Sequence, residues 1–348
     1  MKRRILYTIA GLLTSSLAIG AVALLLPHDD DNGAGPLSPH DGWIDRSPHK
    51  QGFISSGDVR LECLEWGRSP HEEQPPIVFL AGLGLTAHIY DDIAPQFVDA
   101  FRVVALTRRG VGASDKPTNS YSLPTLVDDI RQALDELGIR RAILVGHSFG
   151  CQEAAAFAIQ YPDRVAQIIY LDGAYQTSPE LIELSSELST FLPQYSEEVG
   201  SSFPALLDWH RNNRAGWNEA CEADFRATRV TRPEGISVRS STPDVVFTLM
   251  DFVAKSPPDF SKVTSPALAI FADHQLDDLL ARLEASARKK AAPLVQRFAQ
   301  AQHEQIERFK QNVKNAQVIE LVDADHMCFT QRPQEVVEAM REFLIPSN

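Results

Sequence analysis

The sequence predicts an α/β fold: a mostly parallel, doubly wound sheet of about eight strands, with a helical cap inserted. Apolar strand-like runs alternate with helix-like segments from about residue 53. Such alternation implies right-handed crossovers and helices on both faces of a parallel sheet. The alternation stops between residues 176 and 262 and then resumes. The composition, 44% hydrophobic and 23% charged over 348 residues, is typical of a globular protein.

The individual elements follow from short apolar runs and from helical periodicity. Residues 54–66 suggest a hairpin of two early strands. The other predicted strands are short apolar runs, at residues 76–80, 101–106, 142–145, 165–171, 267–271 and 317–322. Segments with helical spacing or composition cover residues 123–137, 152–160, 276–315 and 333–344.

These elements divide the chain into four parts. Residues 1–26 have a basic start (Lys2, Arg3 and Arg4) and a long apolar run, which predicts a signal peptide or an N-terminal membrane anchor. Residues 27–50 are rich in Pro, Gly, Asp and Asn and predict a flexible linker. Residues 51–175 and 263–348 form the α/β core, and residues 176–262 form the cap. We expect an exported protein that is periplasmic, secreted or anchored facing outward, with a membrane tether through residues 5–26 as one option.

Charge and cysteine content narrow the function further. The formal net charge is −13, so the chain repels phosphate backbones and nucleic acid is excluded as a partner. The four cysteines, at positions 63, 151, 221 and 328, are too few for a disulfide scaffold and lack zinc-type spacing. Buried thiols are the favoured interpretation, and one disulfide is the alternative. The sequence implies no metal and no organic cofactor.

The pentapeptide Gly146-His147-Ser148-Phe149-Gly150 fits G-x-S-x-G and stands between a predicted strand and a predicted helix. A serine hydroxyl is a poor nucleophile, and a sharp strand-to-helix turn presents it to a base without obstruction. Gly146 and Gly150 stand where strand and helix nearly touch, so both must be very small. Ser148 is therefore the predicted nucleophile.

An oxyanion hole needs two backbone donors beside this nucleophile. We assign one to the N–H of Phe149, at the start of the following helix. The other belongs to the loop after the strand ending at Leu80, which reads Ala81-Gly82-Leu83-Gly84-Leu85. The Leu83 N–H is the candidate, because the flanking glycines let the backbone turn inward.

The segment Arg109-Gly-Val-Gly-Ala-Ser114 completes a pattern that resembles the α/β-hydrolase superfamily, in particular its cap-bearing single-domain members. The resemblance covers about residues 53–345 apart from the cap. It departs from the family pattern at Ala81, where a histidine is usual, and at Thr107, where an acidic residue is common. Neither change removes a backbone donor. The resemblance implies a structural role for Arg109, which we expect to bond loop carbonyls.

The same resemblance implies a triad in the order serine, acid, histidine. His326 follows the last predicted strand, where the family places its base, and a neutral imidazole can accept the serine proton. Two carboxylates compete for the acid. Asp172 ends the strand after the nucleophile helix, and Asp273 lies at the end of the next strand. We favour Asp172, keep Asp273 as the alternative acid, and leave Asp277 and Asp278 as remainders.

These residues predict a serine hydrolase that cleaves a carboxylic ester or related acyl bond of a small molecule through an acyl-serine intermediate. The same triad would serve a C–C bond, lactone or small-amide hydrolase. A catalytically silent hydrolase-fold binding protein is the hypothesis from another class. The dehalogenase and epoxide hydrolase branches resemble this fold but use an aspartate nucleophile, so Ser148 argues against them.

Overall fold

The structure is a computed structural model that describes residues 43–345, apart from 68–72, 119, 176–178, 232–236, 240–247, 250–254 and 275–276. The predicted leader, residues 1–26, and most of the predicted linker, residues 27–50, lie outside this part of the chain. Within it, no helix is both long and apolar enough to cross a bilayer.

Eight strands form one sheet, in the order β1-β2-β4-β3-β5-β6-β9-β10. The β1–β2 and β2–β4 pairs are antiparallel, and the other neighbouring pairs are parallel. The predicted fold class is therefore confirmed. The strands are β1 (Lys50–Ser56), β2 (Val59–Glu65), β3 (Ile77–Leu80), β4 (Val103–Leu106), β5 (Ala142–His147), β6 (Val165–Leu171), β9 (Ala267–His274) and β10 (Ala316–Ala324).

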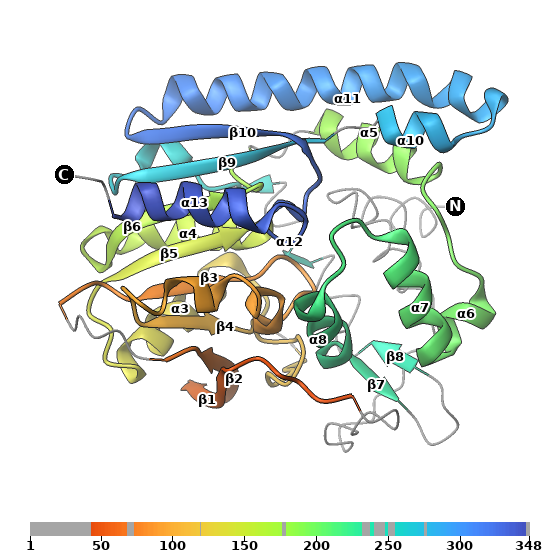
Figure 1. Cartoon of the computed structure of the whole chain (residues 1–348). Coiled ribbons are helices and arrows are strands. Elements are labelled where there is room, and N and C mark those ends of the chain that lie inside the picture. The colour runs from red at the N-terminus through yellow and green to blue at the C-terminus, as the bar shows by residue number, and fades with distance from the viewer. Residues whose placement is uncertain are drawn as a thin grey trace.

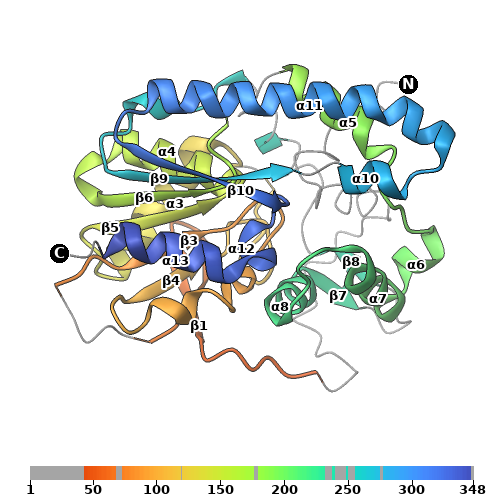
Figure 2. The same cartoon turned by 45° about the horizontal axis from the view of Figure 1, so that its top comes forward.

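Helices cover both faces of this sheet, as Figures 1 and 2 show. The side chains of β3 alternate between two apolar clusters: Val78 and Leu80 belong to one, and Ile77 and Phe79 to the other. Period-two alternation with both faces buried is what a central parallel strand requires. The first cluster includes residues of α3 (Leu123–Glu136), α4 (Phe149–Gln160) and α11 (Ala285–Asn312). The second includes residues of η1 (Ala87–Tyr90), η2 (Ala94–Phe97), α12 (Cys328–Gln331) and α13 (Pro333–Leu344).

The insertion between β6 and β9 lies beside the sheet, at the edge where the parallel strands end (Figure 1). In the described part of the insertion, the helices include α5 (Pro179–Ser189), α6 (Glu197–Ser201), α7 (Phe203–Asn213) and α8 (Glu219–Ala227). It also holds a short antiparallel pair, β7 (Arg229–Thr231) and β8 (Ser237–Arg239), which the sequence did not predict. Its apolar core is aromatic, with Tyr195 and Phe225 buried and Trp209 and Trp217 packed against them.

The second helical excursion consists of α10 (Asp277–Arg282) and the long helix α11. Helix α11 contacts two parts of the molecule. Ile306 and Phe309, near its end, join the sheet cluster, whereas Val295 packs with Leu188 of α5. One helix thus connects the insertion to the sheet. Two short 3-10 turns, η3 (Pro162–Arg164) and η4 (Phe260–Lys262), precede β6 and β9.

Candidate active site

The turn between β5 and α4 holds Ser148 in a strained conformation, with φ 53° and ψ −119°. A non-glycine residue in this region costs about 1–3 kcal/mol and marks a constrained position. A Cβ on Gly146 would overlap the Gly150 carbonyl, and a Cβ on Gly150 would overlap the carbonyl oxygen of Leu80. Both glycines therefore let strand and helix approach closely enough to form this turn.

Asp172 and His326 meet in a buried hydrogen bond at the same edge of the sheet. The distance from Asp172 Oδ2 to His326 Nδ1 is 2.6 Å, and both residues are buried, at 0% and 4% exposure. Asp172 follows β6 and His326 follows β10. The other carboxylate oxygen, Oδ1, accepts hydrogen bonds from the Tyr175 hydroxyl at 2.5 Å and the Ala272 N–H at 3.0 Å. These bonds fix the orientation of the carboxylate.

The alternative acid, Asp273, lies elsewhere. Strand β9 continues to His274, beyond its predicted end at residue 271, so Asp273 is still a strand residue and its side chain is exposed. Residue 272 instead contributes its backbone N–H to Asp172. Asp277 lies at the start of α10. In the described part of the chain, the structure brings Asp172 to His326.

Ser148 lies beside these two residues. Its N–H donates to the Leu171 carbonyl at 3.0 Å, so it stands next to the residue that precedes Asp172. His147, which precedes Ser148 in the sequence, contacts His326. Their ring centroids are 4.7 Å apart, and His147 Nε2 donates to the His326 carbonyl at 2.9 Å. Burial, followed by the nearby His326, lowers the pKa of His147 well below its ordinary value, so this imidazole stays neutral.

The candidate oxyanion loop passes close to the nucleophile. A Cβ on Gly82 would lie 2.9 Å from His147 Nδ1 and 3.3 Å from the Ser148 Cβ, so this position favours glycine. Leu83 packs in one small cluster with Phe149. The two predicted donor residues thus lie on neighbouring segments. Phe149 is at the N-terminus of α4, where the helix dipole favours negative charge.

Arg108, which the sequence analysis did not single out, holds this loop. Its guanidinium donates to the carbonyls of Ala81 at 2.7 Å and Gly82 at 3.1 Å, and it forms a bidentate pair with Glu153 of α4. The expectation for Arg109 needs correction. Its main partner is Asp129, and among the described residues it reaches one loop carbonyl, that of Ser120, at 3.4 Å. Because Arg108 and Arg109 are adjacent, the sequence alone did not show which of them bonds the carbonyls of the oxyanion loop.

Two further residues support the acid. Gln302 of α11 donates to the Tyr175 hydroxyl at 3.1 Å and to the Ala272 carbonyl at 2.9 Å. Burial, followed by the neighbouring Asp172 charge, raises the pKa of Tyr175 well above its ordinary value, so its hydroxyl remains a donor. A chain of hydrogen bonds thus runs from Gln302 through Tyr175 and Asp172 to His326. No sequence pattern connects residues so far apart in the chain.

Comparisons with known proteins agree with this fold. Residues 75–223 match the family model described as alpha/beta hydrolase fold. The chain is 33% identical to epoxide hydrolase 1 of Caenorhabditis elegans over 131 residues, which are 37% of this chain and 30% of that protein. It is 33% identical to 2-(acetamidomethylene)succinate hydrolase of Mesorhizobium japonicum over 119 residues, 34% of this chain and 41% of that protein. These matches span less than half of either relative.

Solved structures resemble about 85% of the chain. E-2-(acetamidomethylene)succinate hydrolase superposes with a TM-score of 0.63 at 19% identity, covering 85% of this chain and 99% of that one. A variant of an epoxide hydrolase from Bacillus megaterium gives a TM-score of 0.58 at 20% identity, covering 84% and 99%. The chain therefore has the α/β-hydrolase fold. The two sequence relatives named above are hydrolases of different substrates.

Proposed function

We propose that this protein is a serine hydrolase that cleaves a carboxylic ester, or a closely related acyl bond, through an acyl-serine intermediate. The observation that carries the proposal is the buried hydrogen bond between Asp172 and His326 beside the strained turn at Ser148. The three residues lie at the ends of β5, β6 and β10. Ligand sites of parallel α/β sheets lie at this edge.

In the proposed reaction, the Ser148 hydroxyl oxygen attacks the substrate carbonyl carbon while His326 Nε2 takes its proton. Asp172 holds the proton on Nδ1 and stabilises the imidazolium. The backbone N–H groups of Leu83 and Phe149 donate to the oxyanion. His326 then gives its proton to the leaving alcohol, and the acyl-serine forms. A water molecule, deprotonated by His326, attacks the acyl carbon and releases the acid, which returns Ser148 to its starting state.

Cleavage of a small amide is the second candidate. It is supported by the likeness to 2-(acetamidomethylene)succinate hydrolase, a name that appears among both the sequence relatives and the solved structures. The same residues would act, with an amine leaving in place of an alcohol. Lactone and C–C bond hydrolysis remain further alternatives on this triad. The epoxide hydrolases among the relatives do not extend to a proposal here, because Ser148 stands where that branch uses aspartate.

The test is labelling with a fluorophosphonate probe, followed by kinetics on p-nitrophenyl esters and anilides of varied chain length. We expect labelling and ester hydrolysis by the wild type, neither by Ser148→Ala, and both by Ser55→Ala, a control at an exposed position of β1. Equal labelling of Ser148→Ala would contradict the proposal. A wild type that does not label at all would favour the catalytically silent binding protein instead. Faster turnover of anilides than esters would favour the amide candidate.

We also propose that the protein is exported and that residues 5–26 direct it to, or hold it at, a membrane. The support is the basic start and the apolar run of the sequence. Fractionation of cells producing the full chain tests this proposal. Recovery in the cytoplasm with an intact N-terminus would contradict it.

A further inference from the structure

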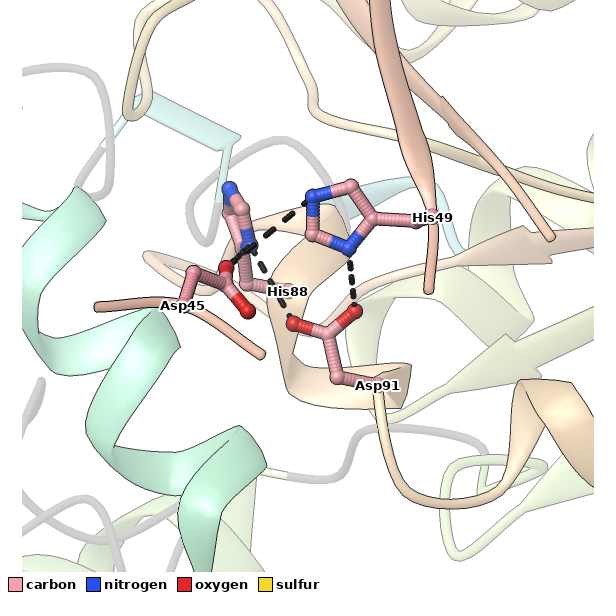
Figure 3. A group of neighbouring side chains, drawn as sticks. All are labelled: Asp45, His49, His88 and Asp91. Carbon is pink, nitrogen blue, oxygen red and sulfur yellow. Dashed lines mark hydrogen bonds and ion pairs between the residues drawn. The ribbon is translucent and has the colours of Figure 1, made fainter. Parts of the chain in front are cut away.

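Four side chains that take no part in the proposed reaction converge outside the active site (Figure 3). Asp45 and His49 come from the segment before β1, and His88 and Asp91 come from η1 and its C-cap. One donor atom from each residue lies within 4.8 Å of those of the other three. Two imidazole nitrogens and two carboxylate oxygens form a set of ligands that transition metals accept.

Two of the distances within this cluster equal those of tetrahedral coordination, and a third is somewhat longer. His88 Nδ1 is 3.2 Å from Asp91 Oδ2 and 3.3 Å from Asp45 Oδ2. His49 Nε2 is 3.9 Å from Asp45 Oδ2. Four ligands at about 2.0–2.1 Å from a zinc ion are separated by roughly 3.3 Å from one another. A charge-assisted N–H···O bond would be shorter, about 2.7–2.9 Å. The two distances from His88 Nδ1 to carboxylate oxygens, 3.2 and 3.3 Å, therefore match two edges of a coordination tetrahedron, and the 3.9 Å distance is longer.

The other ring nitrogens have carboxylates of their own. His49 Nδ1 is 2.8 Å from Asp91 Oδ1, which also accepts the Ser47 hydroxyl at 2.7 Å. His88 Nε2 faces Glu62 Oε1 at 3.7 Å. Histidines that bind metals usually donate their second ring N–H to a carboxylate, which fixes the tautomer and the ring orientation. His49 has this arrangement, whereas Glu62 lies beyond hydrogen-bond distance of His88 Nε2 and interacts with it through its charge.

The charges of the surrounding side chains also favour a bound cation. Three carboxylates, from Asp45, Asp91 and Glu62, surround two imidazoles, and the Glu62 side chain is only 1% exposed. Hydrogen bonds from Thr107 at 2.7 Å and Gln51 at 2.6 Å hold Glu62 in place. Buried negative charge in excess is costly unless it is paired with a cation. A divalent cation would neutralise two of the three carboxylates.

We propose that Asp45, His49, His88 and Asp91 form a binding site for a zinc-class divalent cation. Two nitrogen ligands disfavour Ca²⁺ and Mg²⁺, which prefer all-oxygen sites. Four protein ligands leave no open coordination position, so the site is structural. It joins the segment at residues 43–49 to η1, which follows the candidate oxyanion loop at residues 81–85.

The experiment titrates the chelator-treated full chain with Zn²⁺ by calorimetry and with Co²⁺ by visible absorption. We expect one ion per chain and the intense absorption of tetrahedral Co²⁺. The test variant is Asp45→Asn with His49→Gln, which changes only the segment outside the sheet. Loss of an outer partner alone typically weakens binding about 10–100-fold, so loss of two ligands should weaken it at least about 100-fold.

The matched control is Asp273→Asn with His303→Gln, an exposed pair on other elements, and it should bind as the wild type does. Binding of equal strength by the test variant and the wild type would overturn the proposal. An octahedral Co²⁺ spectrum, or no saturable binding by the wild type, would also overturn it, and neither result depends on how well a variant folds. Ester hydrolysis is measured separately, so failure of this site leaves the proposed function untouched.

Discussion

Replacing Asp172 by asparagine should abolish most activity while leaving the fold intact, and the contacts of Asp172 explain why. Its Oδ1 accepts from two donors, the Tyr175 hydroxyl and the Ala272 N–H. In the variant, the amide oxygen must remain at this position, because an NH₂ group would oppose both donors. The amide nitrogen then faces His326 Nδ1 and donates to it. His326 is forced to carry its proton on Nε2 and cannot accept one from Ser148.

The expected magnitude follows from this tautomer reversal. The equivalent substitution in serine protease triads lowers kcat by about 10⁴, and the same loss here corresponds to about 5.4 kcal/mol in the barrier. Because the hydrogen bonds to Oδ1 survive, the melting temperature of Asp172→Asn should stay within a few degrees of that of the wild type. The assay is p-nitrophenyl ester hydrolysis under saturating substrate.

The matched control for this prediction is Asp273→Asn, at the exposed position in β9 that the sequence offered as the alternative acid. It should retain activity within about twofold of the wild type, since it affects no contact of His326. Activity of Asp172→Asn within tenfold of the wild type would refute the tautomer argument. A loss of several orders of magnitude in Asp273→Asn alone would move the acid to that residue.

Three further predictions concern stability and thiol chemistry. Arg108→Met leaves the buried Glu153 carboxylate unpaired and should lower the free energy of unfolding by about 3–5 kcal/mol, whereas adding Glu153→Leu should recover most of it in urea denaturation. Gly150→Ala should lower the free energy of unfolding by about 3 kcal/mol or more, because the added Cβ meets a backbone carbonyl. The control Gly52→Ala has open space around it, so its free energy of unfolding should be unchanged or higher by up to about 1 kcal/mol. Burial raises the pKa of Cys63 to about 12, so this thiol should resist Ellman's reagent at pH 8 until the protein is unfolded; rapid reaction of native protein would contradict its burial.

The sheet was predictable because its central strands are short, apolar and buried on both faces. The run predicted at residues 165–171 is strand β6 with the same bounds, and the one predicted at 142–145 extends by two residues in β5. The nucleophile turn was predictable for a local reason, since the motif and both flanking elements are contiguous in sequence. All four cysteines are buried free thiols, as the sparse cysteine content favoured.

The parts that escaped prediction depend on contacts between distant segments. The sequence placed both Asp172 and Asp273 at strand ends. The choice between them depends on how far β9 continues, and hydrogen-bond register, not composition, decides this. Similarly, the sequence implied no metal, because the two pairs of the proposed site, at residues 45–49 and 88–91, are brought together only by the path of the chain before β1. Neither pair alone has a recognisable metal-binding spacing.

A strained backbone conformation occurs at or near each of the three strand ends that carry the candidate triad. Among the described residues, the non-glycine residues with positive φ are Ser120, Ser148, Asp172 and Asp323. Ser148 and Asp172 directly follow β5 and β6, and Asp323 lies at the irregularity near the end of β10, three residues before His326. The chain leaves the sheet at Ser148 and Asp172, whereas β10 continues beyond Asp323 to Ala324. Each such residue costs about 1–3 kcal/mol, and the surrounding hydrogen bonds must offset this cost. Three of these four residues thus lie at the strand ends that carry the candidate triad, and strain of this kind is found preferentially at functional sites.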